Sequence, residues 1–212
     1  MRTLRTFFIT AITSLLLANT ALAATNDQQA ASQLSKLLDQ SQSMTGNFTQ
    51  VTLDATGTRL QETKGELALK RPGLFRWHTA APQEQLLISD NQKLWLYDPD
   101  LMQLTIQKMD QRMSHTPALL LSGNVAEIKK NFTINTKANG KLQSFILTPK
   151  DKDSLFNSLT LTFNGNTINS MQLVDNVGQK TNIAFKDIKV NAPVDTSLFK
   201  FVPPEGTDII EE

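Results

Sequence analysis

The sequence has no cysteine and only two histidines, His78 and His115. The first absence excludes a disulfide framework, and the two together leave no spacing of Cys and His that is typical of a zinc site. The sequence also lacks the serine-hydrolase elbow, the H-E-x-x-H zinc motif and the glycine-rich phosphate-binding loops. We therefore expect a protein that is not an enzyme and that holds neither a metal nor a cofactor.

A strong charge of one sign is also missing. The chain has 21 Lys and Arg against 20 Asp and Glu, which gives a formal net charge of +1. A nucleic-acid-binding surface needs a basic patch or stripe, and no long basic run is present. We therefore expect no nucleic acid among the partners.

Long apolar runs are confined to the N-terminus, and none reaches the ~20 residues that a membrane-spanning helix needs. Two arginines precede the apolar run Phe7–Ala18, and Ala21-Leu22-Ala23 is the small-x-small pattern of a signal-peptidase site. We predict a cleaved signal peptide over residues 1–23 and a single soluble, exported domain over residues 24–212. Because no lipobox cysteine is present, we do not expect this chain to be lipid-anchored itself.

Short alternating segments separated by turn residues predict about eleven strands, which hairpin signals such as Asn139-Gly140 make antiparallel. The segments are Gly46–Leu53, Arg59–Leu69, Leu74–Thr79, Gln85–Ser89, Lys93–Tyr97, Met102–Lys108, Phe132–Thr136, Leu142–Thr148, Leu155–Phe163, Thr167–Val174 and Lys180–Ile188.

An amphipathic helix is predicted near Asn26–Gln42, where Leu34 and Leu38 share one face. Short helices are predicted at Pro117–Leu121, which has proline at its start and glycine past its end, and at Val125–Lys130. Roughly eight strands already close a barrel that side chains can fill, so a larger curved sheet needs another filler. We predict a mainly β protein with some α: an incomplete, open antiparallel β-barrel of about eleven strands, with a lid of two or three helices over an apolar cavity.

The segment Lys70–Trp77 combines a basic pair, a Pro-Gly break and an alternating strand. Successive side chains of a strand point to opposite faces, so Phe75 and Trp77 share one face. Two readings stay open here: ordinary core aromatics, or a wall that holds an apolar ligand.

Two strands are apolar on both faces, Leu86-Leu87-Ile88 and Leu94-Trp95-Leu96-Tyr97. Either a second layer covers one side of the sheet, or one face lines a ligand cavity. We name Leu86, Ile88 and Trp95, with Leu34 and Leu38 of the predicted helix, as candidates for the cavity or its rim. Near the middle of the chain, three flexible methionines either fill gaps or form a pliable lipid pocket, and we add them to the cavity candidates: Met102, Met109 and Met113.

Arg71 precedes Pro72, which pushes its backbone toward an extended conformation. It is either a solvated surface residue or a latch whose guanidinium reaches backbone carbonyls of a lid helix.

Six motifs together resemble the LolA family of periplasmic lipoprotein carriers of Gram-negative bacteria, in the family's order and over nearly the whole exported chain. They are Gly46-Asn47-Phe48-Thr49-Gln50, Lys70–Trp77, Leu87-Ile88-Ser89-Asp90, Leu94–Pro99, Thr116-Pro117-Ala118 and Phe199–Gly206. The segment Met109–Lys130 is least similar to the family beyond its Thr-Pro pair, which leaves its share in the lid undecided.

The resemblance implies an incomplete barrel with a helical lid, and a carrier that crosses the periplasm with acylated lipoproteins. Its implied partners are an inner-membrane lipoprotein-releasing ABC transporter and an outer-membrane lipoprotein receptor. Arg71 matches the family arginine that hydrogen-bonds lid helices in the closed form. Phe75 and Trp77 match family aromatics at the cavity and the transporter-facing rim. The receptor is itself a lipoprotein, so the missing lipobox cysteine favours the carrier, which we expect to be a monomer.

Three alternatives remain open from the sequence: a general periplasmic binder of lipids or other hydrophobic ligands on the same fold, an exported hydrolase, and a domain that senses lipoproteins without carrying them. Ligand identity separates the first from a lipoprotein carrier. An esterase screen tests the second, and extraction of cargo from membranes tests the third.

Overall fold

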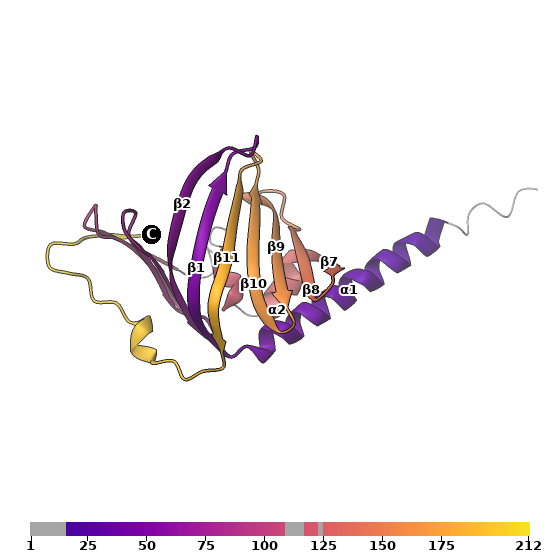
Figure 1. Ribbon diagram of the computed structural model, residues 1–212, viewed down its shortest axis with the longest axis horizontal. Helices are drawn as coiled ribbons and strands as arrows, with labels where there is room; N and C mark the ends of the chain where they lie inside the picture. Colours follow the sequence, from indigo (N-terminus) through magenta and orange to yellow (C-terminus); the bar gives the residue numbers. More distant parts are fainter. Residues whose placement is uncertain (1–15, 109–116, 123–124) are drawn as a thin grey trace, which may run out of the picture.

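The computed structural model describes residues 16–108, 117–122 and 125–212, and their strands form one curved sheet of twelve (Figure 1). The strand order is β12-β6-β5-β4-β3-β2-β1-β11-β10-β9-β8-β7. Neighbours pair antiparallel throughout except for β12 and β6, which are parallel. The two edges, β12 and β7, do not pair with each other, so the barrel is open as predicted.

The strands are β1 (Ser43–Leu53), β2 (Arg59–Lys70), β3 (Leu74–Thr79), β4 (Gln85–Asp90), β5 (Lys93–Asp98), β6 (Gln103–Lys108), β7 (Phe132–Asn139), β8 (Leu142–Pro149), β9 (Phe156–Asn164), β10 (Thr167–Asp175), β11 (Lys180–Val190) and β12 (Asp208–Glu211). The helical segments are α1 (Leu16–Gln40), α2 (Val125–Asn131) and the 3₁₀ turns η2 (Pro117–Leu121) and η3 (Thr196–Phe199). All eleven predicted strands are present, and only their ends differ by a few residues. The twelfth, β12, was missed.

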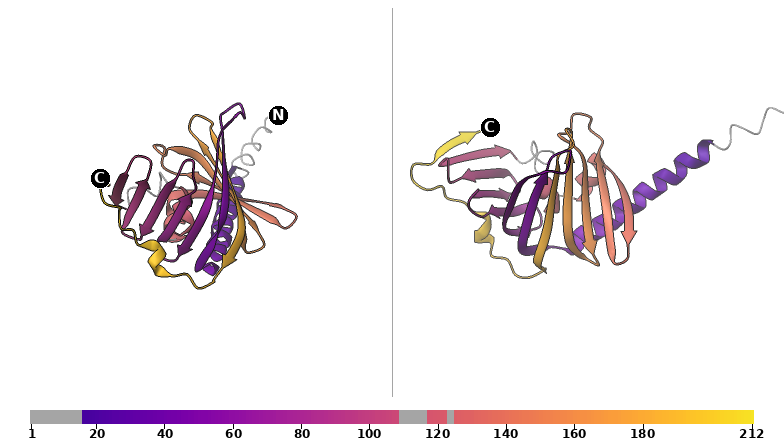
Figure 2. Two further views of the ribbon diagram at one scale, coloured as in Figure 1. Left: turned by 60° about the vertical axis from the view of Figure 1, so that its left-hand side comes forward. Right: turned by 45° about the horizontal axis from the view of Figure 1, so that its top comes forward.

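The helical segments α1, η2 and α2 lie on the concave side of the sheet (Figure 2). Leu34 and Leu38 of α1 are 1% and 3% exposed, and they join η2 and Ile128 of α2 in one apolar cluster with the inner face of the sheet. This cluster is the hydrophobic core, and it joins the helical segments to the inner face on the side where the sequence predicts a cavity.

The last part of the chain, residues 191–212, leaves the end of β11 and returns to the opposite edge of the sheet as β12, and we name it the C-terminal strap (yellow in Figures 1 and 2). Its turn η3 packs on β3 and β4, the ring of Phe201 lies 5.0 Å from that of Tyr97 on β5, and β12 pairs with β6. The strap is therefore a second layer on the outer side of the sheet, and it accounts for the apolar side chains on the outer faces of β4 and β5.

The helix α1 begins earlier than predicted, because it continues without a break through residue 23. The predicted signal-peptide cleavage stays a prediction. Among the described residues, no helix is both long and apolar enough to cross a membrane.

Candidate functional site

Four aromatic rings form a wall on the inner face: Phe48, Phe75, Trp77 and Phe185. Trp77 is at the centre, with its ring centroid 3.8 Å from that of Phe48, 6.1 Å from that of Phe75 and 6.3 Å from that of Phe185. The first two contacts are stacked and the third is edge-on, which are the favourable geometries for aromatic pairs. All four rings are buried, so the wall is dry in this closed form.

The wall depends on a glycine between two strands. Phe48 is opposite Gly65 in the β1–β2 register, and Trp77 lies on the next strand beyond. A Cβ on Gly65 would lie 2.8 Å from the Cζ of Phe48 and 1.9 Å from the carbonyl oxygen of His78. Gly65 therefore leaves the space through which the Phe48 ring crosses β2 and reaches Trp77.

The other half of the interior is also aromatic and aliphatic. Phe132 stacks on Phe156 with centroids 6.1 Å apart, and Phe145 meets Phe163 edge-on at 5.9 Å. The buried polar side chains among the described residues are all hydroxyls, Ser35, Ser43, Thr52, Ser89 and Ser122, and the rest of the buried residues are hydrophobic. The interior is therefore predominantly apolar.

The three candidates on β4 and β5 do not face the interior. Ile88 is opposite Arg76 on β3 and opposite Trp95 on β5, and Leu86 shares its face because it lies two residues away. Arg76 alternates with the two wall residues of β3, so this set points outward. These side chains lie on the outer face, where the C-terminal strap packs on β3 and β4, and Ile88 is fully buried there.

The inner-face residues of these strands are the ones in between. Leu87 is opposite both Trp77 and Leu96, and Leu94 belongs to the core cluster. The sequence does not distinguish the two faces, because both are apolar and a one-residue slip of the β3–β4 register exchanges them.

Of the three candidate methionines, only Met102 lies among the described residues. Met102 lies in the β5–β6 turn with a positive φ of 50° and is 40% exposed, and the hydroxyl of Tyr97 donates a hydrogen bond to its sulfur at 3.9 Å. The turn carries it outside the sheet, so Met102 does not line the interior. Met109 and Met113 lie outside the described residues.

Arg71 follows β2 and is bonded to two separate helical segments. Its Nε donates to the carbonyl oxygen of Ser41, just past α1, at 3.0 Å, and its Nη2 donates to the carbonyl oxygen of Leu121 at the end of η2. Burial lowers the pKa of its guanidinium, and the nearby carboxylate of Asp39 opposes that shift. A single cation thus joins the ends of α1 and η2.

The turn that carries Arg71 is held in place by its neighbours. Gly73 has a φ of +71°, and its N–H donates to the carbonyl oxygen of Ser122 at 3.0 Å, which makes a further bond to the η2 side. The carbonyl of Gly73 accepts a bond from the buried hydroxyl of Ser89 at 2.9 Å. A Cβ on Gly73 would collide with the side chain of Asn91, so glycine is needed here both for φ and for space.

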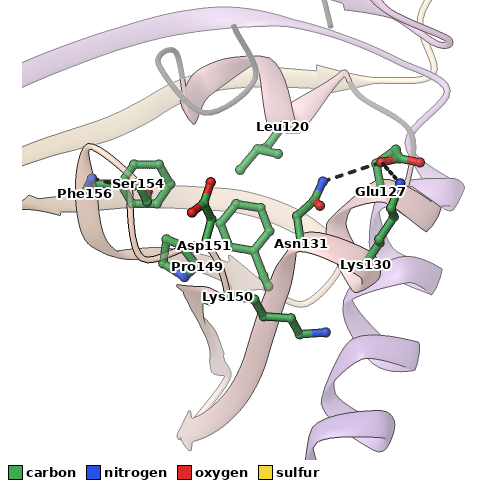
Figure 3. Close-up of a pocket in the computed structure, with 10 residues that line it drawn as sticks. Leu120, Glu127, Lys130, Asn131, Pro149, Lys150, Asp151, Ser154 and Phe156 are labelled. Carbon is green, nitrogen blue, oxygen red and sulfur yellow. Dashed lines mark hydrogen bonds and ion pairs between the residues drawn. The ribbon is translucent and has the colours of Figure 1, made fainter. Parts of the chain in front are cut away.

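A pocket of about 250 Å³ opens where η2 and α2 meet the β8–β9 loop (Figure 3). Three residues of the core cluster, Leu120, Phe132 and Phe156, line it together with charged residues that include Lys130 and Asp151. Core residues and charged surface residues therefore meet in this pocket.

A comparison with protein families matches residues 39–202 to the family described as outer membrane lipoprotein carrier protein LolA. The chain belongs to this family. Among its relatives is an outer-membrane lipoprotein carrier protein of Pseudomonas paraeruginosa, 53% identical over 212 residues and matched over 100% of both chains. Another is the carrier protein of Azotobacter vinelandii, 55% identical over 186 residues, which are 88% of this chain and 90% of the relative.

The fold also has a match among solved structures. A conserved protein from Thermus thermophilus superposes with a TM-score of 0.54 at 11% identity, over 85% of this chain and 99% of the other. At that identity the likeness shows the fold alone, while family membership shows that this chain is a lipoprotein carrier.

Proposed function

We propose that this carrier works in the periplasm as a monomer. It accepts acylated lipoproteins released by an inner-membrane ABC transporter, shields their acyl chains between the sheet and the helical lid, and delivers them to an outer-membrane receptor. No bond in the cargo is made or broken in this cycle, so we propose a role without catalysis. Family membership and the predominantly apolar interior support the proposal.

The observation that carries it is the position of Arg71. Its two side-chain bonds join α1 to η2, the two segments that close the concave face beside the aromatic wall. Hydrogen bonds to a charged donor contribute about 1.5–3 kcal/mol each, which is enough to favour the closed form and small enough for a ligand to overcome. We propose that Arg71 is the latch of the lid.

Energetics favour a carrier whose opening costs free energy. Burying acyl chain is worth about 0.8 kcal/mol per methylene, so roughly 45 methylenes of a triacylated lipoprotein would give on the order of 36 kcal/mol. That exceeds the ceiling of about 20 kcal/mol for non-covalent binding, and a cargo held so tightly would never be released. Partial cover of the chains, together with the cost of opening a closed and self-filled interior, brings the net affinity into a range that permits delivery.

A release assay tests this function. Residues 24–212 are added to proteoliposomes that bear the cognate transporter and a labelled lipoprotein, and the supernatant is examined for a one-to-one complex. We expect wild-type protein to release the lipoprotein and pass it to the receptor. If the transporter is active and the carrier folded but no complex appears, the carrier function is wrong, and mass spectrometry of bound ligands then tests a general lipid binder.

The latch is tested with two matched arginine variants. Arg71→Leu is expected to accept lipoprotein but to transfer it to the receptor at least about tenfold more slowly, because its closed, empty form is no longer favoured. Arg76→Leu removes an arginine from the outer face of the neighbouring strand and is expected to behave as wild type. Normal delivery by Arg71→Leu would contradict the latch.

A further inference from the structure

The end of α1 is held by a second residue, one that neither the sequence pattern nor the latch accounts for. Asn191 lies directly after β11, at the start of the C-terminal strap. Its side-chain Nδ2 donates to the carbonyl oxygen of Gln40 at 2.8 Å, and its Oδ1 accepts from the backbone N–H of Gln42 at 2.8 Å. The amide therefore spans the last residue of α1 and the residue before β1, and it satisfies one carbonyl and one N–H with a single side chain.

Backbone hydrogen bonds around Asn191 hold its side chain in position. Its own N–H donates to the carbonyl oxygen of Ser43 at 2.8 Å, and the hydroxyl of Ser43 donates to the carbonyl oxygen of Ala192 at 2.7 Å. Asn191 has a φ of +58°, in the left-handed region that asparagine tolerates better than most residues. This conformation accompanies a side chain that reaches back to α1 just as the main chain leaves the sheet.

The bonds of Asn191 differ from those of Arg71 in what they connect. The guanidinium of Arg71 donates to the carbonyl oxygens of Ser41 and Leu121, so departure of η2 breaks the hydrogen bond to Leu121. Both side-chain bonds of Asn191 fall on the α1–β1 junction, at Gln40 and Gln42, and neither involves η2. Separation of η2 from α1 therefore leaves the Asn191 bonds unchanged.

We propose that Asn191 is a positioning residue that fixes the C-terminal end of α1 to the sheet, so that the lid opens by movement of the η2–α2 segment while the end of α1 stays in place. The inference rests on the proposed carrier function, because it assigns the moving and the fixed parts of that lid. It also assigns a role in the lid to the start of the strap, because Asn191 directly follows β11 and binds the end of α1.

Amide hydrogen exchange measured by NMR tests this without any cargo. Two backbone amides report on the two connections: that of Gln42, bonded to Asn191, and that of Gly73, bonded to Ser122 beside η2. In full exported protein carrying Arg71→Leu, the Gly73 amide is expected to exchange about two- to tenfold faster than in wild type, the loss of one hydrogen bond's protection, while the Gln42 amide is unchanged. Equal acceleration of both amides would overturn the proposal, since α1 and η2 would then open together.

Variants of Asn191 give the reverse pattern. Asn191→Gly keeps the positive φ and removes both side-chain bonds, so the Gln42 amide is expected to exchange about two- to tenfold faster while the Gly73 amide keeps its wild-type rate. Asn191→Asp retains the acceptor for the Gln42 N–H and loses the donor to Gln40, so Gln42 is expected to stay closer to wild type than in the glycine variant. An unchanged Gln42 rate in Asn191→Gly would also overturn the proposal. Since exchange is measured on empty protein, its outcome is separate from that of the release assay.

Discussion

At the scale of single residues, the site depends on what glycines leave open. Gly65 has no side chain, and the ring of Phe48 occupies the space in which one would stand. Because Gly65 has no Cβ, the ring of Phe48 can stack on that of Trp77 with the ring centroids 3.8 Å apart.

Gly65→Ala is therefore expected to destabilise the protein by about 1–3 kcal/mol, since the new Cβ displaces both the ring and the neighbouring strand. Urea unfolding measures the loss. Fluorescence in a Trp95→Phe background, where only Trp77 emits, shows whether the ring of Phe48 has moved. Gly140→Ala is the control, because nothing lies within 4 Å of its Cβ, and it should cost only the roughly 1–2 kcal/mol of a left-handed backbone. A Gly65 variant as stable as wild type with unchanged emission would contradict this account.

The turn after β1 gives a pH prediction. Asp54 accepts bonds from the side chain of Thr56 and from the backbone of Thr58 and Thr56, which lower the pKa of its carboxyl below its usual 3.8. A depressed folded pKa means that the carboxylate stabilises the fold above the unfolded pKa, and that this stabilisation is lost as the pH falls through 3.8 toward the folded value. Urea midpoints of wild type and Asp54→Asn should therefore converge between about pH 5 and pH 3. A constant difference across that range would exclude the mechanism.

Some residue positions could be predicted from the sequence and others could not. Alternation alone places Phe75 and Trp77 on one face, and the register confirms that they share it. It gives no register between β3 and β4, so the faces of Leu86 and Leu87 were exchanged. Arg71 stood out through its basic pair and proline, whereas Asn191 shows no pattern, because its partners are 149 and 151 residues away in the chain.

At the scale of elements, the C-terminal strap explains what the sequence left open. Beneath it lies a second group of buried residues that is separate from the main core: Ala68, Ile88, Tyr97, Leu104 and Phe199. The strand β12 was missed because four residues carry too little alternation to stand out, and β6 is what orders them. The eleven longer strands have hairpin turns of their own, which is why the sequence predicts them.

Removing the main anchor of the strap tests this layer. Phe199 is 3% exposed, so Phe199→Ala is expected to cost about 3–5 kcal/mol or to detach the strap, which limited proteolysis after residue 191 would reveal. Val202 in the same strap is 86% exposed, and Val202→Ala should change stability by less than about 0.5 kcal/mol. Equal stability of the two variants would mean that the strap is not held by this residue.

At the scale of the whole molecule, side chains of the helical segments pack with the inner face of the sheet in one buried apolar cluster. Cargo must therefore replace contacts between protein side chains. The sequence predicted the open barrel and its helical lid, but it does not show how full the interior is, since filling depends on distances between segments far apart in the chain.

The affinity for acyl chain should reflect this replacement. In a series of triacylated lipopeptides lengthened two methylenes at a time, affinity is expected to rise by less than about fourfold per methylene, the factor that corresponds to about 0.8 kcal/mol. Competition against a fluorescent lipopeptide measures the slope. The full fourfold factor at every step would show that chains enter a space that is already open.

The outer cover of the sheet is uneven, and this has a mechanical consequence. The strap packs on β3 and β4 through η3 and reaches β5 through Phe201, whereas no described element crosses the outer faces of β9, β10 and β11, which face the reader in Figure 1. We therefore expect the strap-covered side of the sheet to be stiffer than the uncovered side. When acyl chain enters between the sheet and the helices, we expect the curvature of β9–β11 to decrease while that of β3 and β4 stays the same. The position of the strap would then decide which part of the sheet changes shape.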